Sequence, residues 1–227
     1  MAFPDYATVG GGDSGVRADE NPISLQGAWS AFGGAGLTGS LKVVSNQIQQ
    51  VGGAGTFNGA YWKKYRFSTT EIIVTLPTLV TSTPYYMKLR LQPSDGVTYP
   101  IPDPAQSGYE CTVGESGSGI WEIYRKTAGT VTSLIQVTGQ PALASGDSIG
   151  FAAIGTTLTG YRKTGAGAWA AVPGLTAVDT RWVDGYSGFV LADPGTTDRM
   201  TNFGFGGVIV ALPSDQPFVP AGRGASW

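Results

Sequence analysis

Histidine is absent from the 227 residues, and Cys111 is the single cysteine. Without histidine, Ser-His-Asp and Cys-His catalysis are excluded, and so is the commonest zinc ligand. One cysteine also excludes a disulfide within the chain. Cys111 stands at an apolar position of a predicted strand, and free cysteine behaves as a small hydrophobic side chain. We therefore predict that Cys111 is a buried core residue.

Charge is also scarce, at 13% of residues with a net charge of −2. In soluble domains, roughly a quarter of the residues are charged. No basic patch is present, so the sequence predicts no nucleic-acid partner. No apolar run reaches the length of a membrane span, so we expect no membrane insertion. The N-terminus has neither the basic nor the apolar region of a secretory signal. We expect a protein that is made in a cytoplasm and is not exported by a recognisable signal.

Sustained helical patterns are missing because the chain carries 35 glycines and 14 prolines, both poor in helix interiors. Strand patterns replace them, and the clearest is a hairpin over residues 108–126. Tyr109, Cys111 and Val113 alternate with polar residues, a Gly/Ser loop follows, and Trp121 and Ile123 alternate again. A period of two in aromatic and β-branched residues predicts half-buried strands.

Further short strands follow the same pattern, to a total of roughly a dozen, as expected of a sandwich. They are predicted at residues 41–50, 60–67, 71–79, 85–91, 131–137, 148–154, 157–162, 169–172, 178–182, 188–191 and 201–205. In 85–91, the alternation places Lys88 and Arg90 on one face with Tyr86, and Leu89 and Leu91 on the other. The sequence thus predicts an all-β, antiparallel two-sheet sandwich over residues 13–207.

Two arms are expected outside this domain. Residues 1–12 form an extended N-terminal arm, held by the aromatic rings of Phe3 and Tyr6. Residues 208–227 begin with an apolar run and continue through three prolines, which is typical either of a docking arm or of a last strand with a frayed end. The proline-rich loop over residues 92–107 is the longest, and such loops are usually functional or disordered.

Candidate chemistry is sparse. Glu110 and Glu122 are the closest approach to a glycosidase carboxylate pair, but each stands alone on its strand. The sequence therefore predicts no enzyme and no catalytic residue. Without histidine the plausible ion is calcium, which takes oxygen ligands from loops. Candidate oxygen donors are Asp13, Asp19, Asn21, Asp193 and Asp198, although aspartate in loops is more often turn chemistry. We predict no cofactor, allow for Ca²⁺, and leave the metal site unknown.

Aromatic side chains give the best candidates for binding, because amphipathic rings stack on the apolar faces of sugars. Five stand in predicted strands or the turns beside them: Tyr61, Trp62, Trp169, Trp182 and Tyr186. The alternative for each is core packing or a subunit interface. We take Tyr61, Trp62, Trp182 and Tyr186 as the candidate carbohydrate-binding residues.

Seven segments in order resemble the concanavalin A-like lectin/glucanase superfamily, in its laminin-G-like form found in tailed-phage virion proteins. They are Arg17-Ala18-Asp19 with Trp29 downstream, Val43-Val44-Ser45-Asn46-Gln47, Ala60-Tyr61-Trp62, Leu89-Arg90-Leu91-Gln92, Gly108-Tyr109-Glu110, Trp121-Glu122-Ile123-Tyr124-Arg125 and Asn202-Phe203-Gly204. The resemblance covers residues 13–206 and implies a two-sheet antiparallel jelly roll. The acidic strand motif of the family's glucanases is missing, and the loop over 92–107 is longer than the family pattern.

The resemblance, with the arms, implies a non-enzymatic bacteriophage virion protein, either a minor tail protein or a capsid decoration protein. Its expected location is the virion. Its expected partners are other virion subunits, a second copy in a homo-oligomer, and host surface glycans. The alternatives are a free-standing carbohydrate-binding module and, third, a polysaccharide hydrolase or lyase. The fold alone does not decide among these functions.

Overall fold

The computed structural model describes residues 3, 12–13, 19, 29–31, 41–45, 47–50, 57–79, 84–92, 106–115, 119–192 and 199–210. These residues form strands and connecting turns, with no helix among them. Accordingly, the described part of the chain holds no helix long and apolar enough to cross a membrane. The all-β prediction is confirmed.

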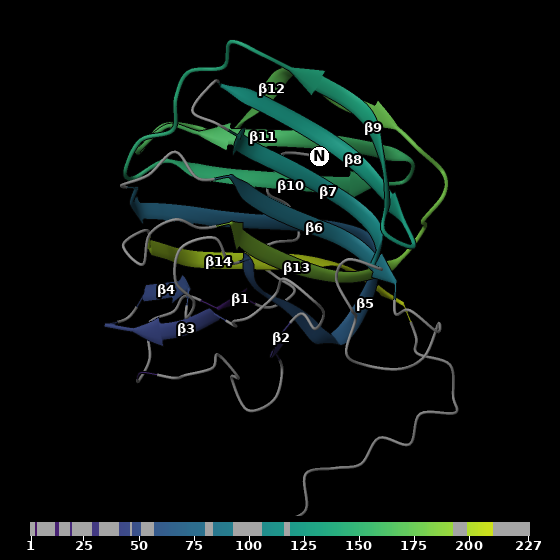
Figure 1. Ribbon diagram of the computed structural model, residues 1–227, viewed down its shortest axis with the longest axis horizontal. Coiled ribbons are helices and arrows are strands. Elements are labelled where there is room, and N and C mark those ends of the chain that lie inside the picture. Colours follow the sequence, from purple (N-terminus) through teal and green to yellow (C-terminus); the bar gives the residue numbers. More distant parts are fainter. Residues whose placement is uncertain are drawn as a thin grey trace, which may run out of the picture.

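The strands form two layers, shown in Figure 1. The front sheet has the order β9-β8-β7-β6-β13-β5-β2, and every pairing is antiparallel. Its strands are β9 (Thr130–Val137), β8 (Ile120–Thr127), β7 (Ser107–Glu115), β6 (Tyr85–Gln92), β13 (Gly185–Ala192), β5 (Phe57–Thr78) and β2 (Trp29–Ala31). β13 lies between β5 and β6, so strands far apart in sequence become neighbours in the sheet.

The back sheet has the order β12-β11-β10-β5-β14, with β1 and β4 paired to β14. Its strands are β12 (Ala170–Val178), β11 (Thr157–Lys163), β10 (Ser148–Ile154), β14 (Arg199–Val210), β1 (Gly12–Asp13), β4 (Gln47–Gln50) and β3 (Leu41–Val44), which pairs with β4. β5 belongs to both sheets: its first half pairs with β13 and its second half with β10 and β14. This 22-residue strand merges the segments predicted at 60–67 and 71–79.

The hydrophobic core fills the space between the layers. β12 contacts β8 and β9, and β10 contacts β6, without hydrogen-bonded pairing. Cys111, Trp121 and Ile123 from the predicted hairpin are buried there, and the hairpin forms with Cys111 opposite Ile123. Burial strongly raises the pKa of the Cys111 thiol, and the Glu110 carboxylate adds to the effect. Cys111 is therefore a core residue, as predicted.

Strand β6 departs from the predicted alternation at Arg90. Tyr85, Met87 and Leu89 face the core as expected, but Arg90 has a φ of 52° and the register shifts between Leu89 and Gln92. Beyond this bulge the faces exchange, and Leu91 packs in a second, smaller cluster. Placing Leu91 with Leu89 was wrong, because a bulge resets the period of two.

Two further boundaries differ from the sequence prediction. β12 runs from Ala170 to Val178 through Pro173, and residues 179–182 leave the sheet, so the strand predicted at 178–182 is wrong beyond its first residue. β14 continues to Val210, past the predicted start of the C-terminal arm. Residues 211–227, and the docking role predicted for them, lie outside the described part of the chain.

In the N-terminal arm, Phe3 stacks on Tyr161 of β11, whereas Tyr6 is not among the described residues.

Candidate functional site

The outer face of the front sheet carries a group of polar side chains in two adjacent rows. Strand pairing places Lys88, Glu110 and Tyr124 side by side across β6, β7 and β8. The next row brings together Tyr86, Thr112, Glu122 and Gln136. Residues at alternate positions point to the same face, and their neighbours Met87, Cys111 and Ile123 point to the core. We call this group the front polar face; it also includes Lys126.

Glu110 is the most buried carboxylate of the front polar face. It forms ion pairs with Lys88 and with Lys126, whose Nζ lies 3.0 Å from Oε2. Burial alone would raise the pKa of Glu110, but the two ammonium groups outweigh it and hold the pKa below its ordinary value. Glu110 is therefore an ionised acceptor at neutral pH, which is the opposite of what a general acid needs.

Glu122 organises the neighbouring row. Its Oε2 accepts a hydrogen bond of 2.5 Å from the Tyr124 hydroxyl and one of 2.8 Å from Gln136 Nε2. On β8, Glu122 is 6% exposed and Tyr124 is half-buried. On β9, Gln136 is exposed. The buried Thr112 hydroxyl, which lies opposite Glu122, finds no hydrogen-bond partner among the described residues. The accessible part of the face is thus Gln136 and the half-buried rings of Tyr86 and Tyr124, beside the buried Glu122 carboxylate.

The structure brings together two of the predicted sugar-binding residues, Tyr61 and Tyr186. Their rings lie 6.3 Å apart and pack with Leu91, Val190 and the half-buried Tyr86 at one end of the front polar face. Tyr61 is fully buried and Tyr186 is 5% exposed. Stacking a sugar on either ring would first require that ring to become exposed.

Trp62 and Trp182 lie elsewhere. Trp62 packs in the main core, 4.6 Å from the Phe205 ring and 5.5 Å from that of Trp29. Trp182 is half-buried before β13, with the Arg181 guanidinium 5.2 Å from its ring. The core-packing alternative therefore describes Trp62 best, and only Trp182 of the four candidates keeps a partly open ring. Sugar binding by these four residues stays a prediction.

Trp182 is held by a network around Asp179. Its backbone N–H donates to the Tyr109 hydroxyl at 3.0 Å, and that hydroxyl donates to Asp179 Oδ1 at 2.7 Å. Arg125 donates to the other carboxylate oxygen at 2.7 Å. Burial works to raise the pKa of Asp179, but hydrogen bonds from Arg181 N–H, Tyr109 and Arg125 lower it overall. Burial also raises the pKa of Tyr109 to about 12, so this phenol stays a donor at neutral pH.

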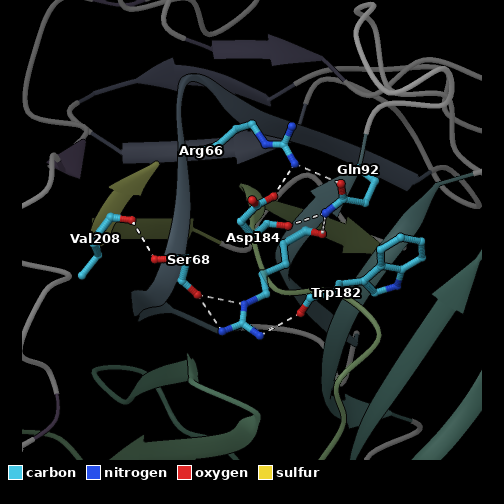
Figure 2. Close-up of polar contacts among 7 residues, drawn as sticks. Arg66, Ser68, Gln92, Trp182, Asp184 and Val208 are labelled. Carbon is cyan, nitrogen blue, oxygen red and sulfur yellow. Dashed lines mark hydrogen bonds and ion pairs between the residues drawn. The ribbon is translucent and has the colours of Figure 1, made fainter. Parts of the chain in front are cut away.

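A second polar cluster lies at the edge where the two sheets meet. Figure 2 shows Arg66 and Gln92 pointing toward Asp184, with Arg66 forming an ion pair with its carboxylate. Beside them, the buried Arg90 guanidinium donates to the carbonyl oxygens of Ser68 and Trp182, at 2.6 and 2.8 Å. Apart from Arg66 Nε, which finds no hydrogen-bond partner among the described residues, these groups satisfy one another, so the cluster mainly joins strands.

The sequence offers loop aspartates and one asparagine as candidate oxygen donors for calcium and leaves the site unknown. Asp19 is exposed, and its Oδ1 accepts a long-range hydrogen bond of 2.9 Å from the Ser45 N–H, in the turn that follows β3. Asn21, Asp193 and Asp198 lie outside the described residues, and of Asp13 only the backbone is described. Within the described residues, no group of three or more acidic or cysteine side chains is placed to hold a metal ion.

Comparisons with known proteins identify the fold. No protein-family model and no curated protein matches the sequence. Among solved structures, the VIP36 exoplasmic/lumenal domain in its Ca²⁺/Man3GlcNAc-bound form is similar with a TM-score of 0.58 and 10% identity, over 90% of this chain and 93% of that one. A Bacillus subtilis protein of unknown function with a galectin-like fold gives 0.56 and 8%, over 85% and 96%.

A legume lectin-like domain from Entamoeba histolytica is similar with a TM-score of 0.55 and 11% identity, over 84% of this chain and 97% of that one. Identities this low establish the fold and nothing more. The chain is a lectin-like jelly roll, which confirms the fold that the sequence resemblance implied.

Sequence reasoning missed most of the front polar face. Glu110 and Glu122 were considered only as a carboxylate pair, while Tyr86, Tyr124 and Gln136 were not considered as binding residues. The signal was present, because these residues occupy the non-core positions of strands whose core positions were recognised. What the sequence lacked was the pairing that places the strands side by side.

Proposed function

We propose that this protein binds glycans without cleaving them, through the front polar face. The main observation behind the proposal is that the Glu122 carboxylate accepts hydrogen bonds from both Tyr124 and Gln136, beside half-buried aromatic rings. Sugars are recognised by such combinations, in which rings stack on the apolar face and fixed polar groups bind hydroxyls. Solved lectin-like domains of the same fold, one of them with a mannose-containing glycan in its name, support the proposal.

A non-catalytic role is supported by the state of the carboxylates. Glycosidases that use paired carboxylates need one held protonated as the acid. Glu110 is held ionised by Lys88 and Lys126, and its row neighbour is Tyr124 rather than a second carboxylate. Incubation with a panel of polysaccharides, followed by a reducing-end assay, should release no product. Release that is lost in the Glu122→Gln variant would favour the hydrolase or lyase instead.

The test of glycan binding is a glycan array followed by calorimetric titration of the strongest ligand. Glu122→Gln and Tyr124→Phe should each weaken binding, because each removes one part of the hydrogen-bonded pair at the carboxylate. Val178→Ala is a matched control, since Val178 is 71% exposed on β12 of the other sheet. Equal affinity of all four proteins for every bound glycan would contradict the proposal.

We propose separately that the protein is a subunit of a bacteriophage virion, in the tail or on the capsid. The alternative is a free-standing carbohydrate-binding module. The virion role is supported by the sequence resemblance and by the N-terminal arm, of which Phe3 docks on the back sheet. Mass spectrometry of purified virions tests it. Hundreds of copies would indicate capsid decoration and a few dozen at most a tail position, while absence would favour the free module.

Calcium dependence is proposed only as an accessory to the glycan site, because some forms of the similar VIP36 domain are named as Ca²⁺-bound. Melting temperatures measured with CaCl₂ and with EDTA should differ if the loops hold an ion. Identical melting curves and identical glycan titrations would remove calcium from the proposal.

A further inference from the structure

The outer face of the back sheet carries an aromatic slot that the chain fills with its own N-terminus. The Phe3 ring stacks on Tyr161 with centroids 3.8 Å apart and planes 4° from parallel. The edge of Trp169 closes one side, 5.0 Å from Phe3 at 82°. Gly150 forms the floor, where a Cβ would lie 2.5 Å from the Phe3 ring. We call Gly150, Tyr161 and Trp169 the back slot.

The distance from Gly12 to the slot can be counted along one row of the sheet. Gly12 pairs with Gly204, and the row continues through Ile73 and Gly150 to Tyr161. Those four strand spacings amount to about 19 Å. Nine residue steps separate Phe3 from Gly12 and span at most about 30 Å when extended. The chain between Gly12 and Phe3 is therefore longer than the distance that it has to span.

The chemistry around the slot is not that of an apolar groove. In the adjacent row of the same sheet face, the buried Glu71 pairs with Ala152. Ala152 pairs with Thr159, whose hydroxyl lies 3.4 Å from that of Thr176. On the other side of Tyr161, Lys163 occupies the next outward position of β11. Burial and the nearby Glu71 carboxylate raise the pKa of Tyr161.

A flat ring platform with hydroxyls and an ammonium group around it suits a sugar better than a hydrocarbon side chain. The platform stacks on the apolar face of a pyranose, and the polar groups bind its hydroxyls. We propose that the back slot is a second sugar-ring site, separate from the front polar face, and that Phe3 is a latch that occupies it until a pyranose displaces the phenyl ring.

The proposal makes Phe3 a competitor, so removing its ring increases the fraction of protein with an open slot. Apparent affinity is reduced by the fraction of molecules that are competent to bind. A latch closed in nine molecules of ten would therefore hide a ten-fold gain in affinity. This gain separates the back slot from the front polar face, whose affinity does not depend on Phe3.

The experiment titrates wild type and Phe3→Ala with four probes: the methyl pyranosides of glucose, galactose, mannose and N-acetylglucosamine. Phe3→Ala should bind at least one of them about ten-fold or more tightly than wild type. The gain should disappear in Phe3→Ala/Tyr161→Ala and persist in Phe3→Ala/Glu122→Gln. If the gain in affinity persists when Glu122 is replaced, it does not come from the front polar face. The test of the back slot therefore does not depend on whether the front polar face binds glycans.

No gain with any of the four probes would overturn the proposal. So would a dimer of wild type that Phe3→Ala abolishes, because the occupant would then be Phe3 of a second copy. A further measurement uses the wild-type sequence, with fluorinated phenylalanine incorporated and the Phe3 signal assigned by its loss in Phe3→Ala. The sugar should shift that signal toward the position of an exposed ring, and an unmoved signal at saturation would count against a latch.

Discussion

The Tyr109 hydroxyl on β7 donates a 2.7 Å hydrogen bond to Asp179 Oδ1, which lies beyond the end of β12. The same hydroxyl accepts from the Trp182 N–H. One buried phenol oxygen therefore connects the front sheet to the segment that leads from the back sheet to β13. The burial that raises the pKa of Tyr109 to about 12 also makes this oxygen costly to leave without partners.

Tyr109→Phe should therefore destabilise the fold while keeping its shape. The change leaves the Trp182 N–H and one Asp179 oxygen each short of a partner, and such groups cost about 1–3 kcal/mol when buried. Urea unfolding followed by tryptophan fluorescence measures the loss. Tyr124→Phe is the matched control, because Tyr124 is half-buried on the next strand. A loss for Tyr109→Phe no larger than that for Tyr124→Phe would contradict the assigned role.

Arg90 gives a second prediction, because its guanidinium serves four backbone carbonyls. It donates to Ser68, Ala153, Gly155 and Trp182, at distances from 2.6 to 3.2 Å. A lysine keeps the charge but offers one nitrogen, which cannot reach carbonyls spread around a planar fork. Arg90→Lys should lower the free energy of unfolding by on the order of 3 kcal/mol, as for other buried groups left unpaired.

The measurement for Arg90→Lys is again urea unfolding, with Arg181→Lys as the control on an exposed arginine. A loss equal to that of the control would mean that the fork geometry is unimportant. A normal unfolding slope with a lower midpoint is expected, because the surface exposed on unfolding should not change.

The hairpin of β7 and β8 was predictable because its information is local. Alternating residues, a Gly/Ser turn and alternating residues again are contiguous in the sequence, and the register follows from the turn. The bulge at Arg90 was not predictable, because its cause is distant in sequence. Gly185, with a φ of 154°, leaves room for the Arg90 backbone, where a Cβ would lie 2.6 Å from its Cα.

The candidate site likewise has features that follow from local sequence and features that depend on which strands are neighbours. The outward positions of each strand could be read from alternation, so Glu110 and Glu122 were noticed. That Glu110 meets two lysines depends on which strands are neighbours. The burial of Tyr61 and Tyr186 depends on it as well, since β5 and β6 both pair with β13. Aromatic identity alone does not tell a sugar platform from a ring packed against its sheet.

The ion pairs of Glu110 predict how stability depends on pH. Its pKa is lower in the folded state than the ordinary carboxyl value of 4.5, so folding favours the ionised form. That stability is fully present above the ordinary value and is lost as the pH falls through the folded pKa. Asp179 shifts in the same direction and adds to the trend. Wild type should therefore lose stability progressively as the pH falls below about 5.

Glu110→Gln isolates this effect. At pH 7 it should cost about 3–5 kcal/mol, because it leaves the ammonium of Lys88 buried without its carboxylate. The difference from wild type should shrink as the pH falls, since protonation removes the same charge from Glu110. Urea unfolding from pH 7 to pH 3 measures it. A difference that stays constant across this range would show that the ion pair does not set the acid sensitivity.

The last prediction concerns the packing of Gly160 on β11 against Leu175 of the neighbouring strand β12. A Cβ at this position would lie 2.2 Å from Leu175 Cδ2 and 3.6 Å from Cys111 Sγ of the opposite sheet. Leu175 and Cys111 are both fully buried, so neither side chain can move aside into solvent. Gly160→Ala should cost about 1–3 kcal/mol, the usual penalty for overpacking a core.

Shortening the obstructing side chain provides the decisive comparison. In Gly160→Ala/Leu175→Val the removed carbon makes room for the added one, so the double variant should be more stable than Gly160→Ala alone. Thermal unfolding of both single variants and the double variant gives the coupling between the two sites. Purely additive losses would mean that the penalty at Gly160 arises from its own strand rather than from contact with Leu175.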